Sequence, residues 1–240
     1  MDTECWRFVD GFTQTGDGWT AVTKHLAHGA GRTLAGAPLG DDFVAAAAEL
    51  GWATTMLETE HRFERTDYVG YSQGGRLCLQ LALDRPEVVH RLVLVSASPG
   101  IADPAERAAR READEVLAQE IERDGVDAFL ERWLAQPLFA TLPPERAGLD
   151  QRQAANTVAT LTHQLRVLGQ GAQPSNWHRL GELAMPVLLI VGALDTKYVD
   201  IARRMADAIP DARVEVLPGA GHACHLEHPE AVAHLLSLSS

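Results

Sequence analysis

Short apolar runs alternate with longer segments of helical periodicity along this chain. The clearest runs are Arg91–Ser98 and Pro186–Val191, where near-continuous valine, leucine and isoleucine predicts strands buried on both faces. Arg213–Leu217 predicts a further strand and Arg7–Val9 a weaker one. Strands that alternate with helices are typical of an α/β fold, in which a mostly parallel sheet is flanked by helices.

Two helices are predicted beside these strands. Arg76–Leu83 is apolar and follows a glycine-rich turn, and Pro229–Leu238 closes the chain with proline in its first turn. The strand before that turn is poorly marked, because only Tyr68 and Val69 follow the charged stretch Arg62–Asp67.

The segment from 101 to 176 has a different character. Pro104–Glu122 and Val126–Leu134 carry helical periodicity and much charge, with no convincing strand between them. About 75 residues exceed a single crossover, since connections in α/β units are short. We therefore predict an α/β core at 1–100 and 177–240 with a helical cap at 101–176; ordinary crossover helices are the alternative.

Composition narrows the possible partners. The 240 residues are 46% hydrophobic and 22% charged, which suits one α/β domain. The net charge of −12 opposes binding to nucleic acid or to anionic lipid. No run of 18 apolar residues occurs, so no membrane insertion is predicted. A small anionic substrate stays compatible, because a few buried arginines outweigh a distant surface field.

Cysteine usage favours a reducing compartment. Cys5, Cys78 and Cys224 are odd in number and lack CxxC spacing, so neither a disulfide framework nor a zinc site is indicated. The acidic start at 1–4 does not resemble a signal peptide. We expect a cytoplasmic protein, either a monomer or a small homo-oligomer.

A nucleophile elbow is the first chemical motif. The stretch GYSQG at 70–74 matches G-x-S-x-G, in which small neighbours let a serine occupy a strained strand-to-helix turn. The turn would expose the Ser72 hydroxyl and place the Gln73 amide at a helix N-terminus, where it can donate to an oxyanion. The alternative is a glycine-rich turn with an incidental serine. The helix and strand that follow favour the elbow.

An acid and a base follow in the order that this motif requires. Asp195 comes after the apolar run at 187–191, at the sheet edge where ligands bind. Its alternative role is a helix cap, and Asp200 is a rival that falls within a helical pattern. His222 lies in the loop PGAGH and can bridge Ser72 and Asp195 as general base. We predict a Ser72–His222–Asp195 triad.

The spacing of His222, His225 and His228 raises metal binding as an alternative. Three-residue steps spread the rings around a helix, which disfavours a shared metal ion. We predict neither a metal site nor a cofactor.

These motifs resemble the α/β-hydrolase family, and more narrowly the 2-succinyl-6-hydroxy-2,4-cyclohexadiene-1-carboxylate synthases (MenH) of menaquinone biosynthesis. The similarity runs from about residue 8 to the C-terminus. The segments that carry it are GFTQTG at 11–16 with Trp19, GYSQGGR at 70–76, WLAQPLF at 133–139, GALDTKY at 192–198 and GAGHA at 219–223.

The resemblance implies a lyase that eliminates pyruvate from 2-succinyl-5-enolpyruvyl-6-hydroxy-3-cyclohexene-1-carboxylate. The serine–histidine pair would then remove a carbon-bound proton. Arg76 and Arg110 are expected to bind substrate carboxylates, with Arg111 competing with Arg110, because arginine pairs bidentately with carboxylates. The alternative for each arginine is a solvated helix charge.

The resemblance also implies further contacts. Trp133 would wall the pocket and donate its indole N–H, although plain cap packing is the alternative. Tyr71 lines the elbow, and the amides of Phe12 and Gln73 would form an oxyanion hole.

Three features depart from the family pattern. Asp10-Gly11-Phe12 replaces His-Gly-Phe, and a Pro-Gly-His-Gly loop is missing where residues 37–42 run on. The N-terminal hairpin strands of the wider fold are also missing. Two other functions therefore stay open: a hydrolase of esters or carbon–carbon bonds with Ser72 as covalent nucleophile, and a non-catalytic ligand-binding protein.

Overall fold

Six parallel strands form the central sheet of the computed structural model, which describes residues 6–26, 31–34, 38, 40–57 and 65–238. The strand order is β2-β1-β3-β4-β5-β6, and each neighbouring pair is parallel. The order reverses between β1 and β3, and ligands bind outside the carboxyl ends of strands at such a reversal. The strands are β1 Trp6–Val9, β2 Gly31–Leu34, β3 Thr66–Tyr71, β4 Val89–Val95, β5 Val187–Gly192 and β6 Ala212–Leu217.

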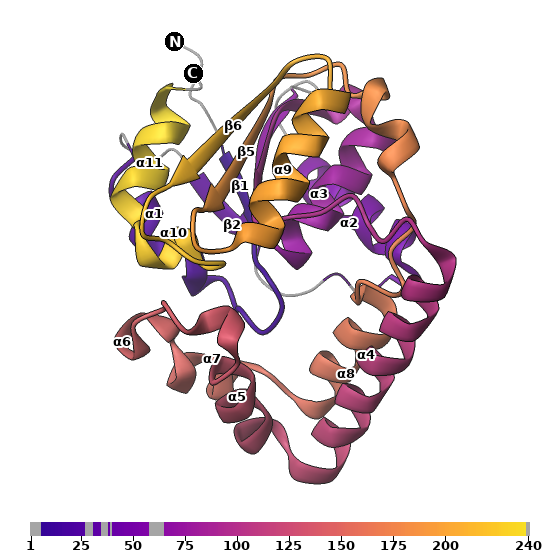
Figure 1. The fold of residues 1–240 in the computed structure, drawn as a ribbon, viewed down its shortest axis with the longest axis vertical. Helices are drawn as coiled ribbons and strands as arrows, with labels where there is room; N and C mark the ends of the chain where they lie inside the picture. The colour runs from indigo at the N-terminus through magenta and orange to yellow at the C-terminus, as the bar shows by residue number, and fades with distance from the viewer. Residues whose placement is uncertain (1–5, 27–30, 35–37, 39, 58–64, 239–240) are drawn as a thin grey trace.

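Helices cover both faces of the sheet (Figure 1). Successive strand residues point to opposite faces, so Leu92 and Leu94 join one buried cluster and Val93 and Val95 join the other. The first cluster packs on α2 (Phe43–Leu57), α3 (Gln73–Asp84) and α9 (Thr196–Ala208); the second packs on α1 (Thr20–Thr23), α10 (Cys224–Glu227) and α11 (Pro229–Leu238).

The parallel α/β architecture predicted from the apolar runs is confirmed, with shifted boundaries. The run at 91–98 forms a strand only to Val95, and that strand begins at Val89. The poorly marked strand before the elbow is a full strand, β3, buried along its length. Asp67 is tolerated there because Arg91 on β4 donates to both of its carboxylate oxygens, at 3.0 and 2.6 Å.

The region after β4 is helical, as its periodicity predicts. Its helices lie beyond the ends toward which the strand arrows point (Figure 1) and have a buried cluster of their own, which includes Ile121, Phe129 and Leu165. Its division from the core at 100/101 and 176/177 remains a proposal. The helices are α4 Pro104–Asp124, α5 Val126–Leu134, α6 Pro144–Ala147, α7 Leu149–Ala155 and α8 Val158–Leu168.

The two ends of this helical segment meet at a stem. The Asn176 amide donates to the Pro99 carbonyl at 2.7 Å, and the Trp177 indole donates to the Gly100 carbonyl at 3.0 Å. Gly100 has φ +97°, a conformation that L side chains rarely adopt. The chain therefore leaves and re-enters the α/β layers at one point.

Four short 3₁₀ segments complete the elements: η1 Asp17–Trp19, η2 Pro86–Val88, η3 Pro137–Phe139 and η4 Trp177–Glu182. Within the described ranges, no helix combines the length and the apolar character that crossing a bilayer requires.

Candidate active site

Ser72 occupies a strained turn between β3 and α3. Its φ of 48° and ψ of −106° lie outside the regions that L residues favour. A Cβ on Gly70 would stand 2.6 Å from the Gly74 carbonyl oxygen, and a Cβ on Gly74 would press against the Val9 carbonyl oxygen. The glycines of G-x-S-x-G are thus required by close backbone packing, which holds the Ser72 side chain at the carboxyl end of the sheet.

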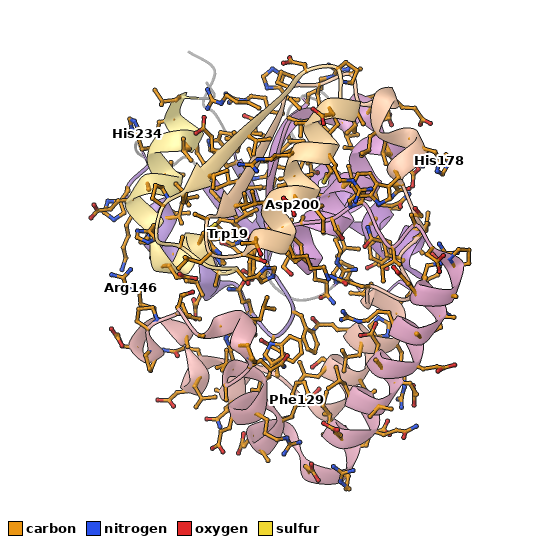
Figure 2. The ribbon with its side chains drawn as sticks, viewed as in Figure 1. Trp19, Phe129, Arg146, His178, Asp200 and His234 are labelled. Atoms are coloured by element: carbon orange, nitrogen blue, oxygen red, sulfur yellow. The ribbon has the colours of Figure 1, made fainter. Side chains whose placement is uncertain are left out.

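Asp195 follows β5 and starts α9, but its side chain caps nothing. Its Oδ2 lies 2.6 Å from Nδ1 of His222 instead. The rival Asp200 lies exposed on α9 (Figure 2). The helix-cap alternative for Asp195 therefore does not describe its side chain.

His222 joins the acid to the serine. Its Nε2 is 3.2 Å from Ser72 Oγ. The Asp195 contact favours the tautomer with a proton on Nδ1, which leaves Nε2 free to accept the Ser72 proton. Ring contacts with Tyr198, at 4.7 Å between centroids, and with Tyr71, at 5.5 Å, shield the imidazole, whose side chain is 3% exposed.

A cavity of about 370 Å³ opens above these three residues, between the sheet edge and the helical segment. Its size is in the range of small-molecule sites. All nine predicted site residues line it: Phe12, Tyr71, Ser72, Gln73, Arg76, Arg110, Trp133, Asp195 and His222.

Arg76 is a fixed, buried cation in the cavity wall. One guanidinium nitrogen donates to the Leu168 carbonyl at 2.8 Å and the other to Gln173 Oε1 at 3.3 Å. Its Nε has no hydrogen-bond partner among the described residues. Burial lowers the pKa of Arg76 to about 10, so the side chain stays charged at neutral pH.

Arg110 reaches the cavity and Arg111 does not line it. Arg110 Nε donates to Asp114 Oδ1 at 2.7 Å, and its Nη1 donates to Gln170 Oε1 at 3.1 Å. These contacts orient a half-exposed guanidinium toward the cavity. Arg111 turns to the Gly171 carbonyl at 3.4 Å. The geometry therefore favours Arg110 over Arg111 as the residue that can meet an anion.

Trp133 packs among aromatic rings and also lines the cavity. Its ring stands edge-on to Phe12 at 5.0 Å and stacks on Phe129 at 5.8 Å, so it packs the helical segment against the core. Its indole nitrogen is buried and has no partner among the described residues. A buried N–H without an acceptor is costly, and a ligand oxygen in the cavity would relieve that cost.

Comparison with known proteins identifies the family of the chain. A model described as the alpha/beta hydrolase family matches residues 4–235. The chain belongs to the alpha/beta hydrolase family.

Curated relatives within the family carry a narrower name. The 2-succinyl-6-hydroxy-2,4-cyclohexadiene-1-carboxylate synthase of Serratia proteamaculans (strain 568) is 32% identical over 175 residues, which are 72% of this chain and 67% of the relative. A Bacillus subtilis (strain 168) protein given the same name provisionally is 37% identical over 182 residues, which are 73% of this chain and 66% of the relative. The match thus spans about two thirds of these relatives.

Solved structures extend the likeness over nearly the whole chain. MenH from S. aureus superposes with a TM-score of 0.89 at 25% identity, covering 99% of this chain and 93% of that one. An esterase from Thermogutta terrifontis has a TM-score of 0.77 at 20% identity, covering 98% and 89%, and shows the shared fold alone.

Asp10 replaces the histidine of the family's His-Gly-Phe, and its carboxylate turns away from the cavity. It accepts a hydrogen bond from the Gly16 amide and lies beside Gly18, inside the loop after β1. Burial raises the pKa of Asp10 to about 6. The Asp10 carboxylate therefore does not face the cavity, and it does not oppose negative charge on an oxyanion there.

The other two departures from the family pattern fall partly outside the described residues. Positions 37 and 39 of the shortened loop are not described, and neither are residues 1–5, where the hairpin strands would stand.

Sequence reasoning missed several residues that line the cavity. Lys197 and Tyr198 follow Asp195 by two and three residues, and the Tyr198 hydroxyl accepts a hydrogen bond from Gln170 at 2.8 Å. Both belong to GALDTKY at 192–198, so their closeness to the acid was the available signal. Gln136 and Gln170 also line the cavity from the helical segment.

The three closely spaced histidines do not converge. His225 is buried between the rings of Trp19, at 4.6 Å, and Tyr71, at 4.1 Å, while His222 faces Ser72. Burial holds the pKa of His225 well below its usual value. Within the described ranges, no three His, Cys, Asp or Glu side chains gather in a way that could hold a metal ion.

Proposed function

We propose that this protein is a carbon–oxygen lyase of menaquinone biosynthesis. It would eliminate pyruvate from 2-succinyl-5-enolpyruvyl-6-hydroxy-3-cyclohexene-1-carboxylate and yield 2-succinyl-6-hydroxy-2,4-cyclohexadiene-1-carboxylate. The observation that carries the proposal is a serine–histidine–aspartate chain opening on a cavity with two arginines. The names of the curated relatives support the same reaction.

The reaction begins with proton transfer. His222 Nε2 takes the Ser72 hydroxyl proton, and the Ser72 oxygen takes a proton from ring carbon 2 of the substrate, which bears the succinyl carbonyl. Asp195 stabilises the imidazolium that forms. A carbonyl next to the carbon makes this proton the acidic one.

The electron pair then moves through the ring. The double bond of the substrate starts at carbon 3 and those of the product at carbons 2 and 4, so the pair forms the 2,3 bond and the ring bond shifts to 4,5. The bond from carbon 5 to oxygen breaks and the enolate of pyruvate leaves. The proton held by His222 passes to this leaving group, whose methylene carbon ends protonated as the methyl of pyruvate, and the neutral imidazole is restored. The amides of Phe12 and Gln73 would stabilise negative charge on the succinyl oxygen in between.

Fixed cations suit a substrate with three carboxylates. Arg76 and Arg110 present guanidinium groups held by protein acceptors, so little freedom is lost when an anion binds. Trp133 would add a donor, and Tyr71 would wall the elbow. A pocket for a neutral ester gains nothing from buried cations, which disfavours simple esterase activity.

The decisive experiment is a pyruvate-release assay on the purified protein with the authentic cyclohexene substrate. We expect steady release, reduced by about 10³-fold or more in Ser72→Ala and His222→Ala. Release of no pyruvate would refute the lyase. Acyl transfer to Ser72 from an activated ester, with turnover, would instead indicate a hydrolase, and ligand binding unchanged by Ser72→Ala would indicate a non-catalytic binding protein.

We further propose that the enzyme works in the cytoplasm as a monomer or small homo-oligomer without a cofactor. The free thiols of Cys78 and Cys224 among the described residues support a reducing compartment. Cell fractionation tests the compartment, light scattering tests the oligomeric state, and activity of the purified protein with no cofactor added tests the third statement.

A further inference from the structure

The turn that carries His222 is tied to a buried acid outside the triad. Gly221, the residue before His222, donates its amide to Glu227 Oε2 at 2.8 Å. Glu227 is only 7% exposed, and its second carboxylate oxygen has no hydrogen-bond partner among the described residues.

Such an acid is unusual in a stable protein. Glutamate is almost never buried unless it is paired, because removing a carboxylate from water is costly. The hydrogen bond described for the Glu227 side chain is a charge-assisted bond from a backbone amide. That bond fixes the backbone on the N-terminal side of His222.

The opposite side of the turn is held by the sheet. The Leu194 amide, one residue before Asp195, donates to the Ala220 carbonyl at 2.9 Å. A Cβ on Gly192 would collide with the carbonyl of Gly221, so the turn rests directly on the end of β5. Asp195 and the His222 turn are therefore placed by the same strand end.

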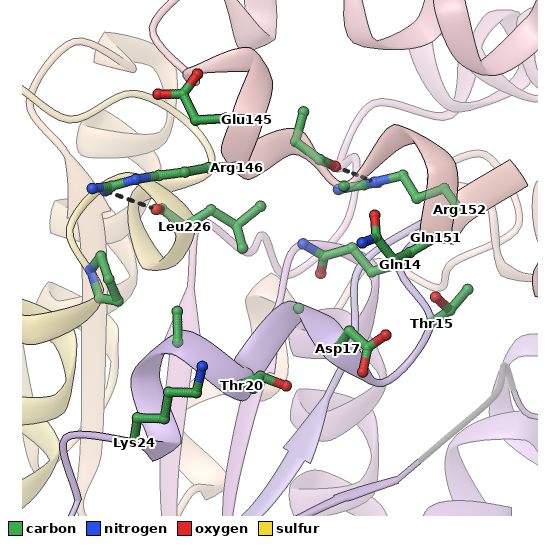
Figure 3. Close-up of a pocket in the computed structure, with 15 residues that line it drawn as sticks. Gln14, Thr15, Asp17, Thr20, Lys24, Glu145, Arg146, Gln151, Arg152 and Leu226 are labelled. Carbon is green, nitrogen blue, oxygen red and sulfur yellow. Dashed lines mark hydrogen bonds between the residues drawn. The ribbon is translucent and has the colours of Figure 1, made fainter.

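The helical segment contacts both α10, the helix that ends at Glu227, and the turn itself. Arg146 of α6 donates from Nη1 to the Glu227 carbonyl at 2.6 Å and to the Leu226 carbonyl at 3.3 Å; Figure 3 draws the bond to Leu226. This contact forms part of the wall of a second cavity, of about 540 Å³, between α1 and α6–α7 (Figure 3). Thr141 packs against Gly221 itself.

We propose that Glu227 is a positioning residue, which acts through Gly221 to keep the His222 ring aligned, and that Arg146 anchors Glu227 from the cap side. The inference rests on the proposed proton transfer through His222. A displacement of about 1 Å in a catalytic group costs on the order of 10²-fold in rate. Arg76 and Arg110 belong to other elements, so substrate binding should be untouched.

Initial rates of three variants separate position from charge. Glu227→Ala removes the acceptor, and kcat should fall about 30-fold with KM within about 2-fold of wild type. Glu227→Gln keeps an oxygen that accepts the Gly221 N–H and should restore kcat to within about 3-fold. Glu230→Gln, an exposed acid three residues on, is the control and should match wild type.

Equal losses in Glu227→Ala and Glu227→Gln would overturn the proposal, as would a wild-type kcat in Glu227→Ala. Arg146→Met tests the cap side if Glu227→Ala does not fold, and its kcat should fall about 5-fold at constant KM. An unchanged kcat in Arg146→Met would remove the cap anchor.

A second readout does not depend on the substrate. The proton between His222 Nδ1 and Asp195 gives a far-downfield ¹H NMR resonance when the ring is held in place. This resonance should persist in Glu227→Gln and broaden or vanish in Glu227→Ala or Arg146→Met. Its persistence in all variants would overturn the positioning role. If the wild-type protein shows the resonance but releases no pyruvate, the proposed lyase activity is refuted. The positioning role of Glu227 is then still tested by the resonance in the variants.

Discussion

The two arginines of the cavity are held in different ways. Arg76 is buried, and two of its nitrogens donate hydrogen bonds to Leu168 and Gln173, so its charge is fixed in the cavity wall. Arg110 is half-exposed and held through Asp114 on its own helix. We therefore expect the Arg110 guanidinium to adjust its position to a carboxylate. Arg76 is expected to act as a fixed positive charge in the cavity wall.

Neighbouring arginines offer a matched test of this distinction. Arg110→Ala should raise KM about 10-fold or more, because it removes a carboxylate partner at the cavity. Arg111→Ala removes a contact with the Gly171 carbonyl and should change KM by less than about 2-fold. Steady-state pyruvate release gives both values. The reverse ranking would assign the substrate contact to Arg111.

Asp10 predicts a pH-dependent effect on stability. Its pKa is about 6 in the folded protein against an ordinary value of 3.8, so the folded state holds a proton that the unfolded state releases between about pH 4 and 6. Stability falls as pH rises through that window. Asparagine does not ionise, so Asp10→Asn lacks this loss. Its free energy of unfolding relative to wild type should rise by on the order of 2 kcal/mol from pH 4 to pH 8.

Urea unfolding at the two pH values measures that gain. A stability difference between Asp10→Asn and wild type that stays constant with pH would show that Asp10 does not change its protonation there.

At this scale, the sequence revealed the residues that belong to motifs. Ser72 and His222 stand in glycine-rich signatures, which exist because the backbone needs those glycines. Glu227 and Arg146 stand in no signature, because their roles arise from contacts between segments far apart in the chain. Lys197 was missed although it follows the predicted acid by two residues.

Among the elements, those with continuous apolar runs were predictable. β5 and β6 differ from prediction by about one residue, and α11 matches its predicted bounds. β3 was underestimated because hydropathy counts Asp67 as polar, whereas its pairing with Arg91 lets it be buried. β2 is four residues long, too short to show alternation, and it was not predicted.

The elbow is the element most sensitive to added volume. Gly74→Ala would place a methyl group against the Val9 and Asp10 carbonyls, which are backbone and cannot swing aside. We expect a loss of about 3 kcal/mol or failure to fold. Gly181→Ala is the control, because its nearest neighbour would be 3.8 Å away, and its loss should stay below about 1 kcal/mol.

Thermal or urea unfolding of the two glycine variants decides between them. Equal stabilities would mean that the backbone around Ser72 can relax, and the packing explanation for G-x-S-x-G would then be wrong.

At the scale of the whole molecule, aromatic rings join the helical segment to the α/β core around the cavity. Phe12 comes from the loop after β1 and meets Trp133 and Phe129 of α5. A smaller side chain at position 12 should loosen the helical segment and leave the backbone amide of that residue in place. The shape of the cavity therefore depends on packing between the helical segment and the loop after β1.

Phe12→Ala should raise KM about 10-fold, change kcat by less than about 3-fold, and increase proteolytic cleavage within the helical segment. Phe12→Leu should lie between Phe12→Ala and wild type. Initial rates and limited proteolysis measure these effects. A fall in kcat at constant KM would mean that Phe12 serves the chemistry and not the packing.

The stem at Pro99–Gly100 and Asn176–Trp177 has an evolutionary consequence. Because the polypeptide departs and returns at one hydrogen-bonded point, insertions, deletions or wholesale replacement of the intervening helices leave the strand order undisturbed. Selection could therefore alter ligand preference in that part while Ser72 and Asp195 stay fixed on strand ends. Substitutions at Arg146 or Thr141 would carry such changes through to His222, because these residues contact α10 and Gly221.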